Sequence, residues 1–220
     1  MQIGQDRGNI VPFAGARKDM RFPAMSEVRA YWEALRNGRL VPLRSEIDPR
    51  GIERALEHAF ILEKIAPRVA RFRLAGMHLT DLLGMEVRGM PLTALFTPDG
   101  RTQITAMTEA VFATPQIAEL SLSAETGFGK PAMDAQLLIL PLRSDLGDIN
   151  RALGCLVAAG HIGRAPRRFT VTDVRLTTIA AGRAPERAAP AAPMGFNETQ
   201  TSFVPPAAQY GHLRLVKTDD

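Results

Sequence analysis

The sequence predicts an α+β fold: two amphipathic helices, then an antiparallel sheet of five to six strands with short helices on one face. Three observations support this prediction. Two stretches before residue 60 repeat apolar residues at helical spacing. Later segments read as short strands, with glycines and prolines at the corners between them. Two very short helical segments and one longer one separate the first strands from the last.

The first amphipathic helix is expected to start at Ser26, whose side chain suits the N-cap position, and to end at Asn37-Gly38. One face of this helix carries the apolar residues Val28, Tyr31, Trp32 and Leu35. The second helix is expected to start at Asp48-Pro49, a capping carboxylate followed by a proline in the first turn. Its apolar positions are Ile52, Ala55, Leu56 and Ala59.

The sheet is expected to begin with strands over residues 60–65 and 69–75, joined by a turn at Ala66-Pro67. Gly76 ends the second strand. A short helix follows, because Leu79, Leu82 and Leu83 repeat at helical spacing before Gly84. Gly89 and Pro91 mark a second corner.

The longer helix is predicted from Thr97-Pro98 to Thr114-Pro115. Four strands follow it, over residues 119–123, 132–142, 151–159 and 169–179, with a turn at 127–131. From Leu137 onward the strand at 132–142 is apolar at every position, which is typical of a central strand.

The two ends of the chain are expected to be flexible, unlike this middle part. Residues 1–24 are expected to form a flexible arm, residues 25–182 the folded domain and residues 183–220 an Ala/Pro-rich flexible tail. Within the tail, the segment 210–217 alternates like a strand.

Composition and charge limit the compartment and the partners. The chain has one cysteine, no apolar run long enough to span a membrane and no secretory signal pattern, so we expect a cytoplasmic protein. The net charge is +4, but the arginines are scattered among carboxylates, so nucleic acid is not an expected partner.

We find no catalytic constellation in the sequence, and we predict that the protein is not an enzyme. The four histidines, His58, His78, His161 and His212, lie far apart in the chain, with no neighbouring ligand at metal-binding spacing. No catalytic residue, metal site or cofactor is therefore predicted.

The middle of the chain resembles the PAS domain, a bacterial sensor module, and more closely a small subfamily of stand-alone bacterial PAS-like proteins. The resemblance runs from about residue 26 to 179. It is carried by residues 31–36 (YWEALR), 42–44 (PLR), Asp48-Pro49 and 71–76 (RFRLAG), with Gly84 and Gly89. It implies a sheet with strand order 2-1-5-4-3, to which this chain adds one strand at an end that the sequence does not identify.

The resemblance also suggests cofactors, which the residues do not favour. Some PAS domains bind haem through a histidine on the longer helix, and residues 97–114 contain none. Light-sensing relatives form a flavin adduct with a cysteine, but Cys155 lies in a strand-like run and reads as a small buried apolar residue.

An apolar ligand cavity between sheet and helices is one candidate site. Its expected lining is Phe60, Leu62, Phe72, Leu74, Leu79, Leu83, Leu95, Phe96, Met107, Val111, Leu138 and Leu140. All these residues also have the type and spacing of an ordinary hydrophobic core, which is the favoured alternative.

Two further candidate sites lie on other parts of the chain. Val28, Tyr31, Trp32 and Leu35 are expected to form an interface, unless this helix face packs on the sheet of its own domain. Arg164, Arg167 and Arg168 form a candidate anion site, since Arg164 and Arg168 have the spacing of the first half of a PilZ motif. The second half is absent, and a solvated basic loop is the favoured alternative.

The leading hypothesis is a cytoplasmic PAS-like sensory and regulatory protein that acts by dimerisation or by docking a protein partner in a bacterial signalling pathway. A homodimer is expected, and a small ligand is an optional modulator. The alternative hypothesis is a receptor whose signal is a bound small molecule or nucleotide.

Overall fold

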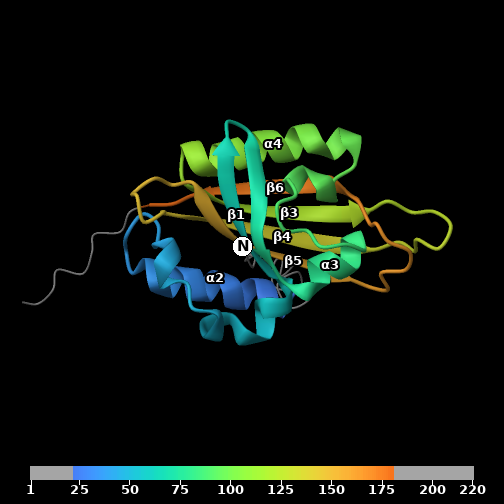
Figure 1. The fold of residues 1–220 in the computed structure, drawn as a ribbon, viewed down its shortest axis with the longest axis horizontal. Coiled ribbons are helices and arrows are strands. Elements are labelled where there is room, and N and C mark those ends of the chain that lie inside the picture. The colour runs from blue at the N-terminus through green and yellow to red at the C-terminus, as the bar shows by residue number, and fades with distance from the viewer. Residues whose placement is uncertain (1–21, 181–220) are drawn as a thin grey trace, which may run out of the picture. The chain divides into compact units, whose positions relative to one another are not determined.

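The computed structural model describes residues 22–180, which form one antiparallel sheet between two layers of helices (Figure 1). The sheet order is β2-β1-β5-β4-β3-β6. The expected 2-1-5-4-3 order is confirmed, and the additional strand joins beside β3. The strands are β1 (Ala59–Ala66), β2 (Val69–Ala75), β3 (Gln116–Ala124), β4 (Asp134–Leu142), β5 (Arg151–Ala159) and β6 (Phe169–Thr178).

One face of the sheet is covered by α3 (Met77–Leu83), η3 (Leu92–Leu95) and α4 (Pro98–Ala113). Here α3 ends at Gly84, which adopts the left-handed conformation with φ 71°. Apolar side chains from these helices and from the strands form one continuous core. The short helices and the longer one thus occupy the positions that the sequence predicts.

The opposite face is covered by α2 (Pro23–Arg36), η1 (Arg44–Glu46) and η2 (Pro49–His58). Figure 1 shows α2 and α4 on opposite sides of the strands. The prediction that Ser26 caps the first helix is wrong, because the helix starts at Pro23 and Ser26 lies inside it. Its predicted end is confirmed, since Asn37 is the left-handed C-cap.

The second predicted helix, η2, is a 3-10 helix with a kink rather than a regular amphipathic α-helix. Ile52 has non-helical angles, φ −133° and ψ 34°. The Asp48 cap is present, and its side chain accepts a hydrogen bond from the Arg50 N–H at 3.0 Å. Because the kink turns the apolar face, Ile52 and Ala55 are buried but Leu56 is 44% exposed.

A β-bulge interrupts the pairing of β2 with β1. Ile61 pairs with Leu74 and Leu62 pairs with Phe72, so Arg73 is the extra residue. A bulge shifts the alternation of side chains by one position. Leu74 therefore faces the α2 side of the sheet, although Phe72 faces the α3 and α4 side.

The predicted arm and tail lie almost wholly outside the described residues, as does the strand-like segment 210–217. Phe22 is buried and helix α2 starts before residue 25, so the folded part begins slightly earlier than predicted. No helix within residues 22–180 is long and apolar enough to cross a membrane.

Candidate functional site

Most of the predicted ligand lining lies in the core between the sheet and the α3, η3 and α4 layer. These side chains are at most 4% exposed and belong to one continuous cluster: Phe60, Leu62, Phe72, Leu79, Leu83, Leu95, Phe96, Met107 and Val111. The Phe60 and Phe72 rings meet edge to face, with centroids 5.3 Å apart. These side chains pack on one another, in the arrangement of an ordinary core.

Three residues of the predicted lining lie elsewhere. Strand β4 is apolar on both faces. Leu138 and Leu140 face α2, whereas Leu137 and Ile139 face the core under α3 and α4. Leu74 is 52% exposed on the α2 side, because of the bulge at Arg73. The predicted cavity is therefore incorrect for these three residues.

The predicted interface on the first helix is wrong for two of its four residues, which are buried inside their own domain. Val28 and Trp32 are 0% exposed and pack on the sheet of their own domain. The Trp32 Nε1–H donates to the Pro141 carbonyl at 3.0 Å, which fixes α2 on β4. Tyr31 and Leu35 are half-buried, and the Tyr31 hydroxyl accepts from the Asp48 N–H at 2.7 Å.

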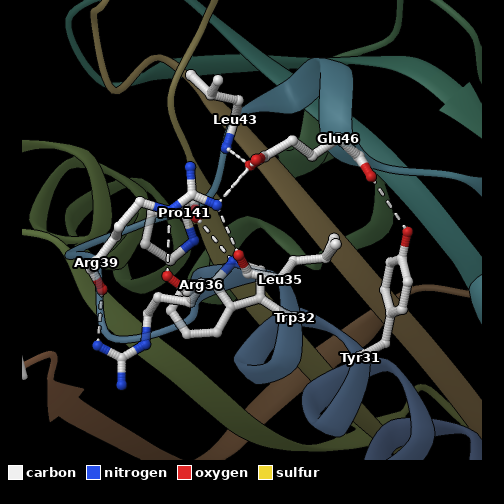
Figure 2. A network of polar contacts seen from close by, with 8 residues as sticks. All are labelled: Tyr31, Trp32, Leu35, Arg36, Arg39, Leu43, Glu46 and Pro141. Carbon is white, nitrogen blue, oxygen red and sulfur yellow. Dashed lines mark hydrogen bonds and ion pairs between the residues drawn. The ribbon is translucent and has the colours of Figure 1, made fainter. Parts of the chain in front are cut away.

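A polar network at the C-terminal end of α2 holds this helix to the following segment (Figure 2). Arg39 donates to both oxygens of the Glu46 carboxylate at 2.9 Å, and the Leu43 N–H donates to the same carboxylate at 2.8 Å. Arg39 also donates to the Leu35 carbonyl at 2.6 Å. Burial acts to raise the pKa of Glu46, but the bonds from Leu43 and Arg39 outweigh it, and the pKa lies below its ordinary value.

The three arginines of the predicted anion site do not form one site. Arg167 is 0% exposed and donates to the carbonyls of Ile162, Glu125 and Pro131. Arg164 and Arg168 are exposed. The anion-site prediction is wrong for Arg167, because its guanidinium donates to carbonyl groups of two loops instead of facing solvent.

Two histidines that are distant in the sequence meet in the structure. The rings of His58, at the end of η2, and His78, on α3, lie edge to face with centroids 4.6 Å apart. The Ala158 N–H donates to His78 Nε2 at 3.2 Å. Burial lowers the pKa of His78, and the nearby His58 lowers it further. The sequence contained no signal for this pair, since the strands β1 and β5 bring the two residues together.

Cys155 is fully buried on β5, as the sequence predicts, and burial raises the pKa of its thiol to about 12. It packs in the core on the α2 side of the sheet. Within residues 22–180, no three side chains of His, Cys, Asp or Glu gather as a metal site requires.

An apolar groove, which the sequence did not predict, lies between η2 and the β1–β2 hairpin on the α2 side of the sheet. Its volume is about 300 Å³. Ile61 and Leu153 contribute to its floor, and Leu56 and Leu74 contribute to its walls. These two wall residues are 44% and 52% exposed.

Arg44 is the one charged residue that lines this groove. Its backbone N–H donates to the Arg143 carbonyl at 2.8 Å, which fixes the chain at this point. Among the described residues its guanidinium has no hydrogen-bond or ion-pair partner. The groove therefore combines apolar walls with one free positive charge, which suits an apolar group next to a carboxylate.

Comparisons with known proteins give one family match. A family model described as "PAS domain" matches residues 20–157, more than half of the chain. A search among curated proteins found no match.

Solved structures that the chain matches include three from studies of light-oxygen-voltage proteins. A domain from a study of a flavin analogue is 17% identical with TM-score 0.40, over 51% of this chain and 84% of that one. The light state of the blue-light photoreceptor Aureochrome1 LOV is 14% identical with TM-score 0.36, over 51% and 88%. An RNA-binding light-oxygen-voltage receptor is 14% identical with TM-score 0.35, over 71% of this chain and 36% of that one.

Proposed function

Because the chain belongs to the PAS domain family, a family with sensory and regulatory roles, we propose that its output is the binding of a protein partner at the groove beside η2. The supporting observation is the pair of exposed leucines, Leu56 and Leu74, on the two walls of this groove. Apolar side chains at a concave surface are typical of recognition sites.

The kind of partner follows from the groove's chemistry. An inserted apolar side chain would contact Leu56, Leu74 and the floor residue Ile61. A carboxylate beside that side chain would pair with the free guanidinium of Arg44. We therefore expect a partner segment that presents a leucine-like residue next to Asp or Glu, and we expect no catalysis at this surface.

The test compares two full-length baits that differ in where a negative charge is placed. Leu74→Asp puts a carboxylate on the groove wall, whereas Phe128→Asp puts one on the β3–β4 hairpin, where Phe128 is 95% exposed. Each purified bait is incubated with extract of the native host, and bound proteins are quantified by mass spectrometry. We expect at least one protein to bind the wild type and Phe128→Asp and to be lost with Leu74→Asp.

Circular dichroism spectra that match the wild type establish that both variants fold. If the groove variant and the hairpin variant retain the same proteins, the groove is not the docking surface.

A second candidate function is a small-molecule receptor, favoured by the groove volume of about 300 Å³ and the free Arg44 guanidinium. This size lies at the lower end of known ligand sites. The expected ligand is an amphipathic carboxylate whose chain lies between Leu56 and Leu74. Native mass spectrometry of freshly purified protein distinguishes this function: a retained mass that Arg44→Gln abolishes supports it, and protein without adduct contradicts it.

A further inference from the structure

Strand β6 is an edge of the sheet, and among the described residues only the segment at Phe96 and Thr97 pairs with its outer side, where the Thr97 N–H donates to the Phe169 carbonyl at 3.0 Å. Strand β6 pairs with β3 along its other side. The edge at β2 differs, because the Phe72 N–H donates to the Met90 carbonyl at 3.0 Å and the Gly89 N–H donates to the Phe72 carbonyl at 2.8 Å. Beyond Phe169, the backbone groups along the outer side of β6 are therefore available to a further strand.

Around Val174, charged and apolar side chains alternate along β6. Asp173 and Arg175 lie on the α2 side, opposite Ser121 and Glu119 of β3. Val174 and Leu176 lie on the α4 side and are 42% and 41% exposed. Two apolar side chains thus lie partly uncovered at a free sheet edge, beside one negative and one positive residue.

We propose that β6 pairs antiparallel with β6 of a second copy of this chain, around a two-fold axis at Val174. In this register Asp173 lies opposite Arg175 of the second copy, and Arg175 lies opposite its Asp173. Directly opposed side chains on one face of an antiparallel pair are in contact distance. Two cross-strand ion pairs then form on the α2 side, while the two Val174 side chains meet on the α4 side.

Other registers lack this complementarity. A centre at Asp173 places two carboxylates opposite each other, and a centre at Arg175 places two guanidinium groups opposite each other. A shift by half a step places Val174 opposite Arg175. The strand is thus self-complementary in charge around Val174, as a contact between two identical surfaces requires.

This inference rests on the proposed function in that both assign the protein an output through association, but it uses another surface. The groove lies against β1 and β2, and β6 is at the far edge of the six-stranded sheet. Pairing through β6 therefore leaves one groove accessible on each copy, and the dimer presents two docking sites to partners.

Charge reversal tests the pairing in the full-length protein, with molar mass measured by light scattering over a series of concentrations. We expect a dimer for the wild type. Asp173→Arg and Arg175→Asp each place like charges opposite each other, so each should weaken dimerisation at least tenfold. The double variant, Asp173→Arg with Arg175→Asp, restores both ion pairs and should restore the dimer.

The matched control is Arg88→Asp, which reverses an exposed charge away from β6 and should leave the dimer unchanged. Circular dichroism verifies the fold of each variant. Val174→Lys offers a second check, because it places two ammonium groups together at the proposed axis and should give a monomer.

A monomeric wild type, a dimer that survives both single reversals, or a double variant that remains monomeric would each overturn the proposal. A wild type that dimerises only after deletion of residues 183–220 would also overturn it, and would identify the chain's own tail as the occupant of the edge. Leu74→Asp should keep the dimer. The docking proposal for the groove and the dimer proposal for β6 can therefore be refuted independently of each other.

Discussion

Gly154 on β5 and Phe60 on β1 are directly paired residues, and the glycine allows the aromatic ring to lie against the backbone of β5. A Cβ atom at Gly154 would overlap the Phe60 ring. Phe60 also contacts Phe72 on the next strand, so its ring cannot move without disturbing the core.

We therefore expect Gly154→Ala to lower the free energy of unfolding by about 1–3 kcal/mol, the usual range for an overpacked core. The measurement is urea unfolding followed by circular dichroism. Gly127→Ala is the control, since a Cβ atom at Gly127 meets nothing within 4 Å. Equal stabilities for the two variants would contradict the close packing of Phe60 on Gly154.

We expect His78 to make the stability of the fold depend on pH. The folded pKa lies below its ordinary value of 6.5 because the ring is desolvated and faces His58, while Glu57 and Asp81 act in the opposite direction. Protonation of Nε2 also removes the acceptor for the Ala158 N–H. A lowered folded pKa means that the unfolded chain binds the proton first, so this contribution is complete above pH 6.5 and is lost as the pH falls below it.

Urea unfolding at a series of pH values measures this effect. We expect the wild type to lose stability from pH 6.5 downward, and we expect His78→Gln to lose less, because an amide oxygen accepts the same bond without titrating. His161→Gln is the control, since His161 is exposed. A pH profile that His78→Gln leaves unchanged would exclude His78 as the source.

At the scale of elements, Trp32 attaches the whole of α2 to the sheet. Its indole is fully buried and donates to the Pro141 carbonyl at the end of β4. We expect Trp32→Phe to lower the free energy of unfolding by about 1–3 kcal/mol, because it leaves a buried carbonyl unpaired and a small cavity. Guanidinium unfolding measures the loss.

The oligomeric mass of Trp32→Phe should equal that of the wild type, since the residue lies inside its own domain. A change in mass with an intact circular dichroism spectrum would mean that this helix face contacts another chain after all. Leu35→Ala, at a half-buried position of the same helix, is a suitable comparison.

Which elements the sequence predicts depends on how local their signals are. The Asn37 cap, the Gly84 corner and the central strand β4 are visible in the sequence, because each depends on residue type or on an apolar run. The bulge at Arg73 is not visible, because nothing in residues 69–75 marks the extra residue. For this reason the alternation placed Leu74 on the wrong face, and the groove could not be predicted.

The same limit applies to the candidate sites. Val28 and Trp32 have the residue types of an interface and of a core alike, and only the tertiary structure shows that they pack on β4 and β5. Arg167 looks like its exposed neighbours in the sequence, yet it donates to the carbonyls of Glu125 and Pro131, which are distant along the chain, as well as to that of Ile162. Long-range contacts of this kind have no local signature.

At the scale of the molecule, two hydrophobic cores share one sheet. Strands β1, β4 and β5 contribute side chains to both, for example Leu137 to one core and Leu138 to the other. Loss of either helix layer would therefore expose a face of the strands that support the other. We expect the described domain to unfold in one cooperative transition.

Two probes test this cooperativity in a single urea titration. Trp32 is the only tryptophan in the chain, so fluorescence reports on the α2 layer, and far-ultraviolet circular dichroism reports on the domain as a whole. The two midpoints should coincide. A fluorescence change at lower urea than the circular dichroism change would show that α2 separates from the sheet as an independent unit.

The two ends of helix α3 make chemically different hydrogen bonds to the rest of the domain. Near its start, His78 accepts from the β5 backbone, and near its end the Leu82 carbonyl accepts from the N–H of Arg167 at 2.7 Å. The bond between Leu82 and Arg167 joins two backbone groups, and the Arg167 guanidinium keeps its charge at any pH at which proteins fold, so none of these groups titrates together with His78. Protonation of His78 therefore weakens the polar contact at the start of α3 and leaves the one at its end unchanged.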